Sequence, residues 1–302
     1  MVPHPRTILE NLFPSLHLAA NYAREIQPRI VAQPDKPDAG STFAAALSDA
    51  DLSIQTAVEV ALLGSFPSLH FYGEEYAKSY NTKYFKSLDI PQDDNYLVLL
   101  DPIDGTQFYL DGHQNYHIML SVVDRQDYCA SLIINPPSQT YYYAIRGEGA
   151  YQGTLPKTIG EVPLSSAVPL RLNQENLNQE TLSPEGVIYL GSQVPNLVKH
   201  IPVNYKVINL ATDYSKSVQV FNHTGILTGG VLGSALGSNK LIDVAAVAFV
   251  AQEAGCKVTT LRGTPLPPLT EAQDYDRLGG VLISVTEQIH ELLVTAAIAA
   301  GY

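Results

Sequence analysis

Apolar residues recur along this chain with two different periods, and these periods predict where helices and strands lie. Helical spacing covers residues 7–30 and 50–63, and Pro14 predicts a kink or a later start in the first of these helices. Further helices are expected at 213–222, 244–255 and 286–300. Runs rich in β-branched and aromatic residues predict strands, chiefly at 69–72, 97–100, 116–123, 129–135, 140–145, 187–191, 203–210, 257–260 and 280–284.

The most informative of these runs is the strand at 97–100, because of the residues that follow it. Leu97–Leu100 has the content of a strand buried on both faces, and it leads into Asp101-Pro102-Ile103-Asp104-Gly105-Thr106. The proline and glycine predict a turn directly after residue 100. Two carboxylates at the end of a buried strand require a cation, and Mg²⁺ held together with a substrate phosphate is one solution. A solvated Asp-Pro turn is the structural alternative.

Other acids also follow predicted strands or precede predicted helices. Glu74 and Glu75 come after the strand at 69–72, and a solvated loop is the simpler interpretation of this pair. Asp51 lies near the start of the second helix, and Asp243 precedes the helix at 244–255. Helix capping would account for both of these aspartates. Each acid therefore has an ordinary structural explanation when it is taken alone.

Composition narrows the protein class without selecting a function. The chain has 302 residues, of which 45% are hydrophobic and 16% charged, as in soluble globular proteins. Its formal charge of −12 argues against a partner such as a nucleic-acid polymer or an anionic membrane. Cys129 and Cys256 provide neither a disulfide framework nor a cysteine metal motif. No targeting segment and no membrane-spanning segment is recognised, so a cytoplasmic location is expected.

Three sequence blocks together resemble the inositol monophosphatase superfamily, the Mg²⁺-dependent, lithium-sensitive phosphomonoesterases. The first block is Gly73-Glu74-Glu75, preceded by Phe66-Pro67. The second and most specific is D-P-I-D-G-T at residues 101–106. The third begins at Asp243 with D-V-A-A and continues to Q-E-A-G at residues 252–255. The resemblance covers roughly residues 40–285.

The resemblance implies a metal site that holds two to three Mg²⁺ ions. Glu74, Asp101 and the backbone carbonyl of Ile103 would hold a first ion. Asp101, Asp104 and Asp243 would hold a second, so that Asp101 bridges the two. A third, more weakly bound ion would be held by Glu74, which is also assigned a catalytic role.

The same resemblance implies how water and phosphate would be held. Asp51 would work with Thr106 to orient the attacking water. Gly105 and Thr106 would offer backbone N–H groups to the phosphate, with Asp104 in the same substrate-binding set. Hydrolysis by metal-activated water needs no covalent phosphoenzyme.

The expected fold is α+β, a layered α/β/α/β/α sandwich of the sugar phosphatase type. An N-terminal subdomain, residues 1–155, would carry the metal motifs, and residues 156–302 would complete the metal site and substrate pocket. The implied enzyme is a hydrolase of inositol or sugar phosphates. Its expected partners are a small phosphorylated metabolite and a second copy of the chain, with which it forms a homodimer. A 3′(2′),5′-bisphosphate nucleotidase and a non-catalytic phosphometabolite-binding module remain alternatives.

Departures from the family pattern leave the substrate open. Ile242 stands where many relatives have Trp, Ala246 replaces a frequent glycine, and the R-x-x-G-S-A stretch is not recognisable in residues 215–233. The connection after Thr106, Q-F-Y-L-D-G-H-Q-N-Y-H-I-M-L, has the length and aromatic positions of the bisphosphate nucleotidase branch. For His113 and His117, which lie in this connection, contact with substrate and a structural role are the two alternatives, and the structural role is the simpler interpretation.

Overall fold

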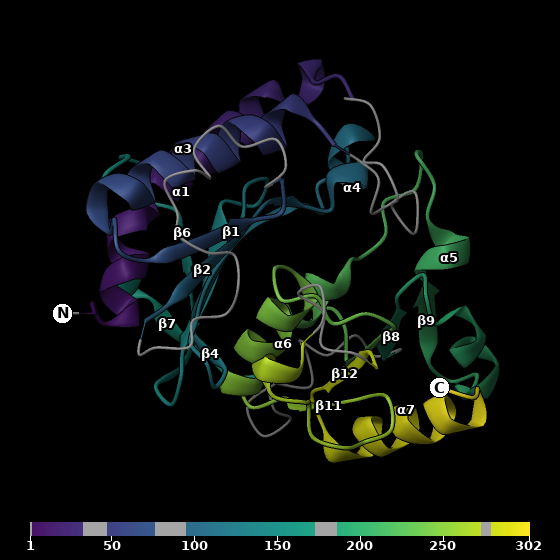
Figure 1. Ribbon diagram of the computed structural model, residues 1–302. Helices are drawn as coiled ribbons and strands as arrows, with labels where there is room; N and C mark the ends of the chain where they lie inside the picture. Colours follow the sequence, from purple (N-terminus) through teal and green to yellow (C-terminus); the bar gives the residue numbers. More distant parts are fainter. Residues whose placement is uncertain (1, 33–46, 76–94, 173–185, 273–278) are drawn as a thin grey trace. The chain divides into compact units, whose positions relative to one another are not determined.

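Two units make up the computed structural model, which is drawn in Figure 1. Unit 1 comprises Met1–Ile145 and Gln152–Val168, and unit 2 comprises Arg146–Tyr151 and Pro169–Tyr302. The structure describes residues 2–32, 47–75, 95–172, 186–272 and 279–302. Each unit contains a β-sheet with helices, so the predicted mixed α+β fold is confirmed.

A seven-stranded sheet begins in unit 1, with the strands in sequence order from β1 to β7. β1 runs parallel to β2, and each of the pairs β2–β3, β3–β4 and β4–β5 is antiparallel. Most positions of β2 to β5 are buried, which explains their nearly unbroken apolar sequences. The strands are β1 His70–Gly73, β2 Leu97–Asp104, β3 His117–Val123, β4 Tyr128–Asn135, β5 Thr140–Ile145, β6 Gly149–Thr154 and β7 Val168–Leu170.

Two long helices, α1 (Pro5–Ile26) and α3 (Asp49–Ser65), lie side by side against the sheet of unit 1 (Figure 1). The apolar stripe of α1 is buried, with Ile8, Leu12 and Leu16 at most 1% exposed. Pro14 lies inside α1, and the helix runs through it, so the late start, one of the two predicted alternatives, is wrong. Tertiary packing of the stripe outweighs the single backbone hydrogen bond that a proline removes.

Unit 2 is built on a five-stranded sheet with the order β11-β12-β10-β8-β9. β8 pairs in parallel with β9 and β10, whereas β12 pairs antiparallel with β10 and β11. Helix α7 packs on β12 and β10, and α6 packs on β11 and β12. The elements are β8 Val187–Leu190, β9 Lys206–Asn209, α5 Leu210–Asp213, β10 Gly233–Leu236, α6 Val244–Glu253, β11 Lys257–Thr259, β12 Val281–Ser284 and α7 Glu287–Ala299.

The helix predicted at 213–222 is absent from this described part of unit 2. Helix α5 ends at Asp213, whose carboxylate accepts a hydrogen bond from the backbone N–H of Asn209. Ser215 and Val218 then form an isolated antiparallel bridge. This polar segment offers no apolar stripe for burial, and its serines favour turns over helix. In the described helices, no stretch is long and apolar enough to cross a membrane.

Candidate active site

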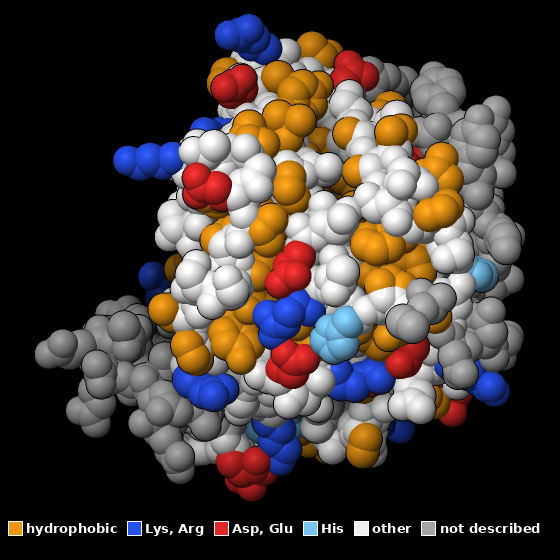
Figure 2. Space-filling view, turned by 90° about the vertical axis from the view of Figure 1, so that its left-hand side faces the viewer, with side chains coloured by type: hydrophobic (Ala, Val, Ile, Leu, Met, Phe, Trp, Pro, Cys, Tyr) orange, Lys and Arg blue, Asp and Glu red, His pale blue; other side chains and the backbone are white. Residues whose placement is uncertain are grey.

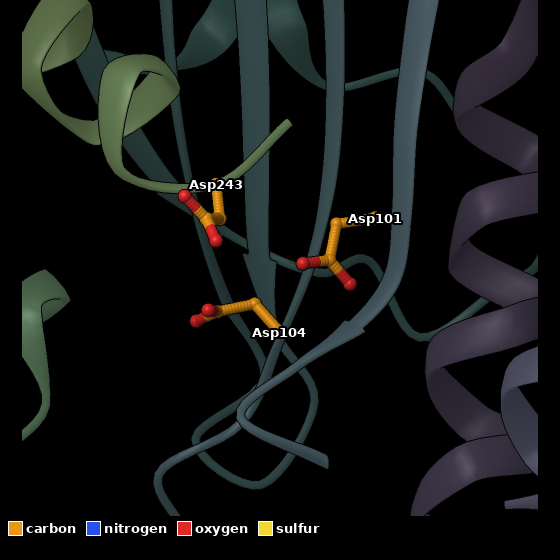
Figure 3. Close-up of side chains that lie close together, drawn as sticks. All are labelled: Asp101, Asp104 and Asp243. Carbon is orange, nitrogen blue, oxygen red and sulfur yellow. The ribbon is translucent and has the colours of Figure 1, made fainter. Parts of the chain in front are cut away.

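Strand β2 supplies the two carboxylates at the centre of the candidate site. Asp101 is 3% exposed and Asp104 is 7% exposed, so both are buried. A carboxylate oxygen of one lies within 4.8 Å of a carboxylate oxygen of the other. Figure 3 shows the two side chains reaching into the same space from the end of β2. Unit 1 therefore brings together the two aspartates that the sequence proposed as neighbours.

The strand continues through both aspartates, so the predicted turn after Leu100 is wrong. β2 ends at Asp104, and the register against β3 shifts between Asp101 and Asp104. A bulge of this kind interrupts the ladder of hydrogen bonds, and proline is tolerated there because no N–H is required of it. Pro102 therefore lies within β2, although its sequence signal predicted the end of the strand.

Electrostatics favour a bound cation beside Asp101 and Asp104. Two buried carboxylates so close together repel each other, and each loses the hydration that stabilises its charge. A hard divalent cation removes both penalties, and carboxylate and carbonyl oxygens are the ligands that Mg²⁺ prefers. The carbonyl oxygen of Ile103, which lies between the two, accepts a hydrogen bond of 2.9 Å from the Thr106 hydroxyl. The donor set of this segment therefore suits Mg²⁺.

Asp51 and Thr106 come into contact although 55 positions separate them in the chain. The Thr106 hydroxyl lies 3.3 Å from Oδ1 of Asp51, which is 0% exposed. Oδ2 of the same carboxylate accepts hydrogen bonds from the backbone N–H and the hydroxyl of Ser48, at 2.9 and 2.5 Å. Ser48 and Asp51 thus form the capping box of α3. Both interpretations of Asp51 hold together: it caps a helix, and its second oxygen meets Thr106.

The turn that carries Thr106 depends on a glycine. Gly105 has a φ of +82°, and a Cβ built on it would lie 2.9 Å from the carbonyl oxygen of Asn115. A side chain at this position would therefore meet both backbone strain and a close contact with main chain. Helix α4, Thr106–Leu110, begins directly after it. The glycine lets the chain turn tightly enough to place Thr106 beside Asp51.

Glu74 and Glu75 lie at the end of β1, next to β2. The backbone N–H of Glu74 donates to the carbonyl of Leu100, which brings Glu74 level with Asp101 in the parallel pair. Among the described residues, Glu74 belongs to no group of three or more acids that each offer one carboxylate oxygen within 4.8 Å of the others. Glu75 is 4% exposed, and its N–H donates to the side chain of Gln55. The solvated-loop interpretation is therefore wrong for Glu75.

Asp243, the third side chain labelled in Figure 3, belongs to unit 2. It is the N-cap of α6, and its carboxylate accepts a hydrogen bond from the backbone N–H of Val244. The predicted capping position is thus confirmed. Its role as a metal ligand remains a prediction.

The two histidines that follow Thr106 lie in different surroundings. His113 is buried, its ring packs edge-on against Phe108, and its backbone carbonyl accepts a hydrogen bond from Gln27. His117 is 3% exposed and pairs with Asp104 across β2 and β3, with 3.6 Å between Nδ1 and Oδ2. Sequence reasoning assigned His117 no role, because only the register of β2 and β3 reveals its neighbour.

Comparison with known families and structures adds independent information. Residues 15–300 match the inositol monophosphatase family. A staphylococcal inositol monophosphatase, solved as a lithium-soaked inhibitory complex, has a TM-score of 0.70 and 20% identity, covering 100% of this chain and 98% of that chain. An IMPase/NADP phosphatase complexed with Mg²⁺ and phosphate has a TM-score of 0.68 and 20% identity, covering 97% and 96% of the respective chains. At such identities these two likenesses concern the fold.

A curated relative carries a different name. The protein called glucose-1-phosphate thymidylyltransferase from Streptomyces griseus is 26% identical to this chain over 217 residues. The matched region is 72% of this chain and 73% of the relative. This degree of identity does not by itself define a family.

Proposed function

The chain belongs to the inositol monophosphatase family, and we propose that it is a Mg²⁺-dependent phosphomonoesterase that hydrolyses a small inositol or sugar phosphate. One observation carries this proposal beyond family membership. The Thr106 hydroxyl lies 3.3 Å from the buried carboxylate of Asp51, directly after the strand that carries Asp101 and Asp104. A hydroxyl beside an acid is an arrangement that can hold and deprotonate a water molecule.

Five residues would supply the proposed metal site. They are Glu74, Asp101, Asp104 and Asp243, through their carboxylates, and Ile103, through its backbone carbonyl. Two to three Mg²⁺ ions are expected there, as the family resemblance implies. When bound, such ions neutralise the phosphate charge, lower the pKa of a water and stabilise the leaving oxygen. The buried carboxylate pair on β2 supports this proposal.

Asp51 and Thr106 would position the nucleophile. A water that donates to Thr106 Oγ1 would hand its proton through the hydroxyl to Oδ1 of Asp51. The hydrogen bonds from Ser48 to Oδ2 hold that carboxylate in place, so little reorganisation would accompany the proton transfer. The backbone N–H groups of Gly105 and Thr106 would receive the phosphate oxygens.

A nucleotide phosphate is the second candidate substrate. The long connection between Thr106 and β3 resembles that of bisphosphate nucleotidases, and one similar structure is named as an IMPase/NADP phosphatase. A phosphate on a nucleotide ribose is therefore proposed as the alternative. The non-catalytic binding module is disfavoured, because a binder has no need of the Asp51–Thr106 pair.

For its assembly, we propose a cytoplasmic homodimer. The outer side of α1 exposes large apolar side chains, with Leu18 at 55% and Tyr22 at 37%. These residues and Ile159, which is 47% exposed, line a hollow of about 520 Å³ in unit 1. Acidic and basic side chains are interspersed on the coloured part of the face drawn in Figure 2, so this face does not favour a nucleic-acid polymer as partner. Light scattering coupled to gel filtration measures the mass of the assembly in solution and so tests for the dimer.

Phosphate release from a small substrate panel tests the proposed function. Inositol 1-phosphate, fructose 1,6-bisphosphate, adenosine 3′,5′-bisphosphate and NADP would each be assayed with and without Mg²⁺. We expect turnover of one of the first two, only with Mg²⁺, and loss of nearly all activity in Asp101→Asn with the fold retained. Asp49→Asn, the same change at an exposed site on α3, should remain active. Binding of these compounds without turnover would support the binding module instead.

A further inference from the structure

We propose that His117 is a positioning residue that holds Asp104 in the orientation required for metal binding. Asn135, in turn, determines which ring nitrogen of His117 carries the proton. The proposal rests on the function proposed above, because it concerns residues that support a ligand of the same metal site. It arises from three side chains that share no sequence motif. They belong to three neighbouring strands, β2, β3 and β4.

The three side chains form a row across the sheet of unit 1. Asp104 lies opposite His117 in the antiparallel pair β2–β3. Ile118 lies opposite Ile134 in β3–β4, so the next position brings His117 opposite Asn135. Their atoms agree with this register, since Nε2 of His117 lies 3.0 Å from Nδ2 of Asn135 and Nδ1 lies 3.6 Å from Oδ2 of Asp104. Cross-strand neighbours of this kind interact directly.

The hydrogen bonds determine which nitrogen of His117 carries the proton. The backbone N–H of Ser138 donates to Oδ1 of Asn135 at 2.9 Å, and a backbone N–H can only donate. The amide nitrogen of Asn135 is therefore the atom that faces His117, so Nε2 accepts a hydrogen bond. In the neutral imidazole the proton then lies on Nδ1, which faces Asp104. The hydrogen bonds thus run from Ser138 to Asn135 and from Asn135 to His117, which places the Nδ1 proton on the side of Asp104.

A neutral donor at this position suits a metal ligand better than a cation would. The separation of 3.6 Å between Nδ1 and Oδ2 is longer than a hydrogen bond, so the N–H group acts on the Asp104 carboxylate as a nearby dipole. This dipole favours one orientation of Asp104 without adding a positive charge that would compete with Mg²⁺. Because His117 is only 3% exposed, its ring is held in place by its surroundings. Residues that support a metal-ligating group in this way typically contribute about 10- to 100-fold to metal affinity.

Variants at both positions test the proposal. His117→Leu removes the donor, and His117→Gln replaces it with an amide that can still donate. Asn135→Ala frees the tautomer at a partly exposed site, where loss of folding is less of a risk. Ser121→Ala is the matched control, because it breaks the hydrogen bond between Ser121 and Ser131 on the same strands, β3 and β4. Calorimetric titration with Mg²⁺ alone gives the affinity, and phosphate release gives the Mg²⁺ concentration for half-maximal rate.

We expect His117→Leu and Asn135→Ala to weaken Mg²⁺ binding by about 10- to 100-fold, with kcat at saturating Mg²⁺ changed much less. His117→Gln should recover a large part of the affinity, and Ser121→Ala should bind as the wild type does. If the wild type is active and the folded His117→Leu and Asn135→Ala variants bind Mg²⁺ with unchanged affinity, the role of His117 is overturned and the proposed function still stands. A wild type that neither binds Mg²⁺ nor releases phosphate would overturn the proposed function and this inference with it.

Discussion

Replacing Thr106 by valine tests the proposed chemistry most directly, because valine keeps the shape of the side chain and removes only the hydroxyl. The hydroxyl has a single proton and two acceptors, the Ile103 carbonyl at 2.9 Å and Oδ1 of Asp51 at 3.3 Å. Both acceptors are buried, and a buried acceptor that loses its donor costs about 1–3 kcal/mol. The variant should therefore remain folded and lose about that much unfolding free energy in urea.

The effect on catalysis should be larger than the effect on stability. Positioned proton transfer contributes about 10²- to 10⁴-fold to a rate, which corresponds to about 2.7–5.4 kcal/mol in activation free energy. We therefore expect kcat of Thr106→Val to fall by that factor at saturating substrate and Mg²⁺. Asp51 should keep its place in the variant, because Ser48 still donates two hydrogen bonds to its Oδ2.

Two further variants complete the test. Thr106→Ser keeps the hydroxyl and loses one buried methyl group, which is worth about 0.8 kcal/mol, so its kcat should stay within about tenfold of the wild type. Asp51→Asn combined with Thr106→Val should be no slower than the worse single variant, because residues that act as a unit are not additive. A folded Thr106→Val enzyme whose kcat lies within tenfold of the wild-type value would refute the assigned role.

Three further predictions concern the turn, the helix cap and a buried histidine. Gly105→Ala should lose more unfolding free energy in urea than Gly112→Ala, because both have positive φ (+82° and +79°) but only Gly105 also meets a neighbouring carbonyl. Asp243→Asn should keep the stability of α6, since asparagine caps as well as aspartate, and yet bind Mg²⁺ at least about tenfold more weakly in calorimetry. Burial lowers the pKa of His290, so the unfolded chain takes up this proton at a higher pH than the folded chain does. The protein therefore loses stability as the pH falls below 6.5. Urea unfolding at pH 7 and pH 5 should show a smaller loss of stability in His290→Gln than in the wild type.

Local patterns predicted much of the fold, because burial leaves a periodic signature in the sequence. The apolar stripe of α1 and the continuous apolar runs of β2 to β5 are examples. The helix predicted at 213–222 failed for the converse reason, since a few apolar residues among serines do not make a buried face. Pro14 also misled, because a proline signal is local whereas the packing of α1 extends over its whole length.

The sequence predicted the acidic residues of the candidate site but not the side chains that lie beside them. Asp51, Asp101 and Thr106 follow from motif blocks whose spacing resembles a known family. The row from Asp104 to Asn135 has no such signal, because it depends on the register of three strands. A register is a property of paired strands, and a shift by one residue would exchange every neighbour. Structure was therefore required to find His117.

The bulge in β2 joins these observations into one physical argument. In a regular strand, residues three positions apart point to opposite faces, so Asp101 and Asp104 could not share a cation. Asp101 lies opposite Met119 and Asp104 opposite His117, so two residue steps in β3 correspond to three in β2. This extra residue brings the two carboxylates to within 4.8 Å, and it also places Asp104, instead of Ile103, opposite His117. Pro102 lies within the bulge, where its missing N–H costs least. The bulge at Pro102, which made the sequence resemble a turn, is therefore what brings Asp101 and Asp104 together and places His117 beside Asp104.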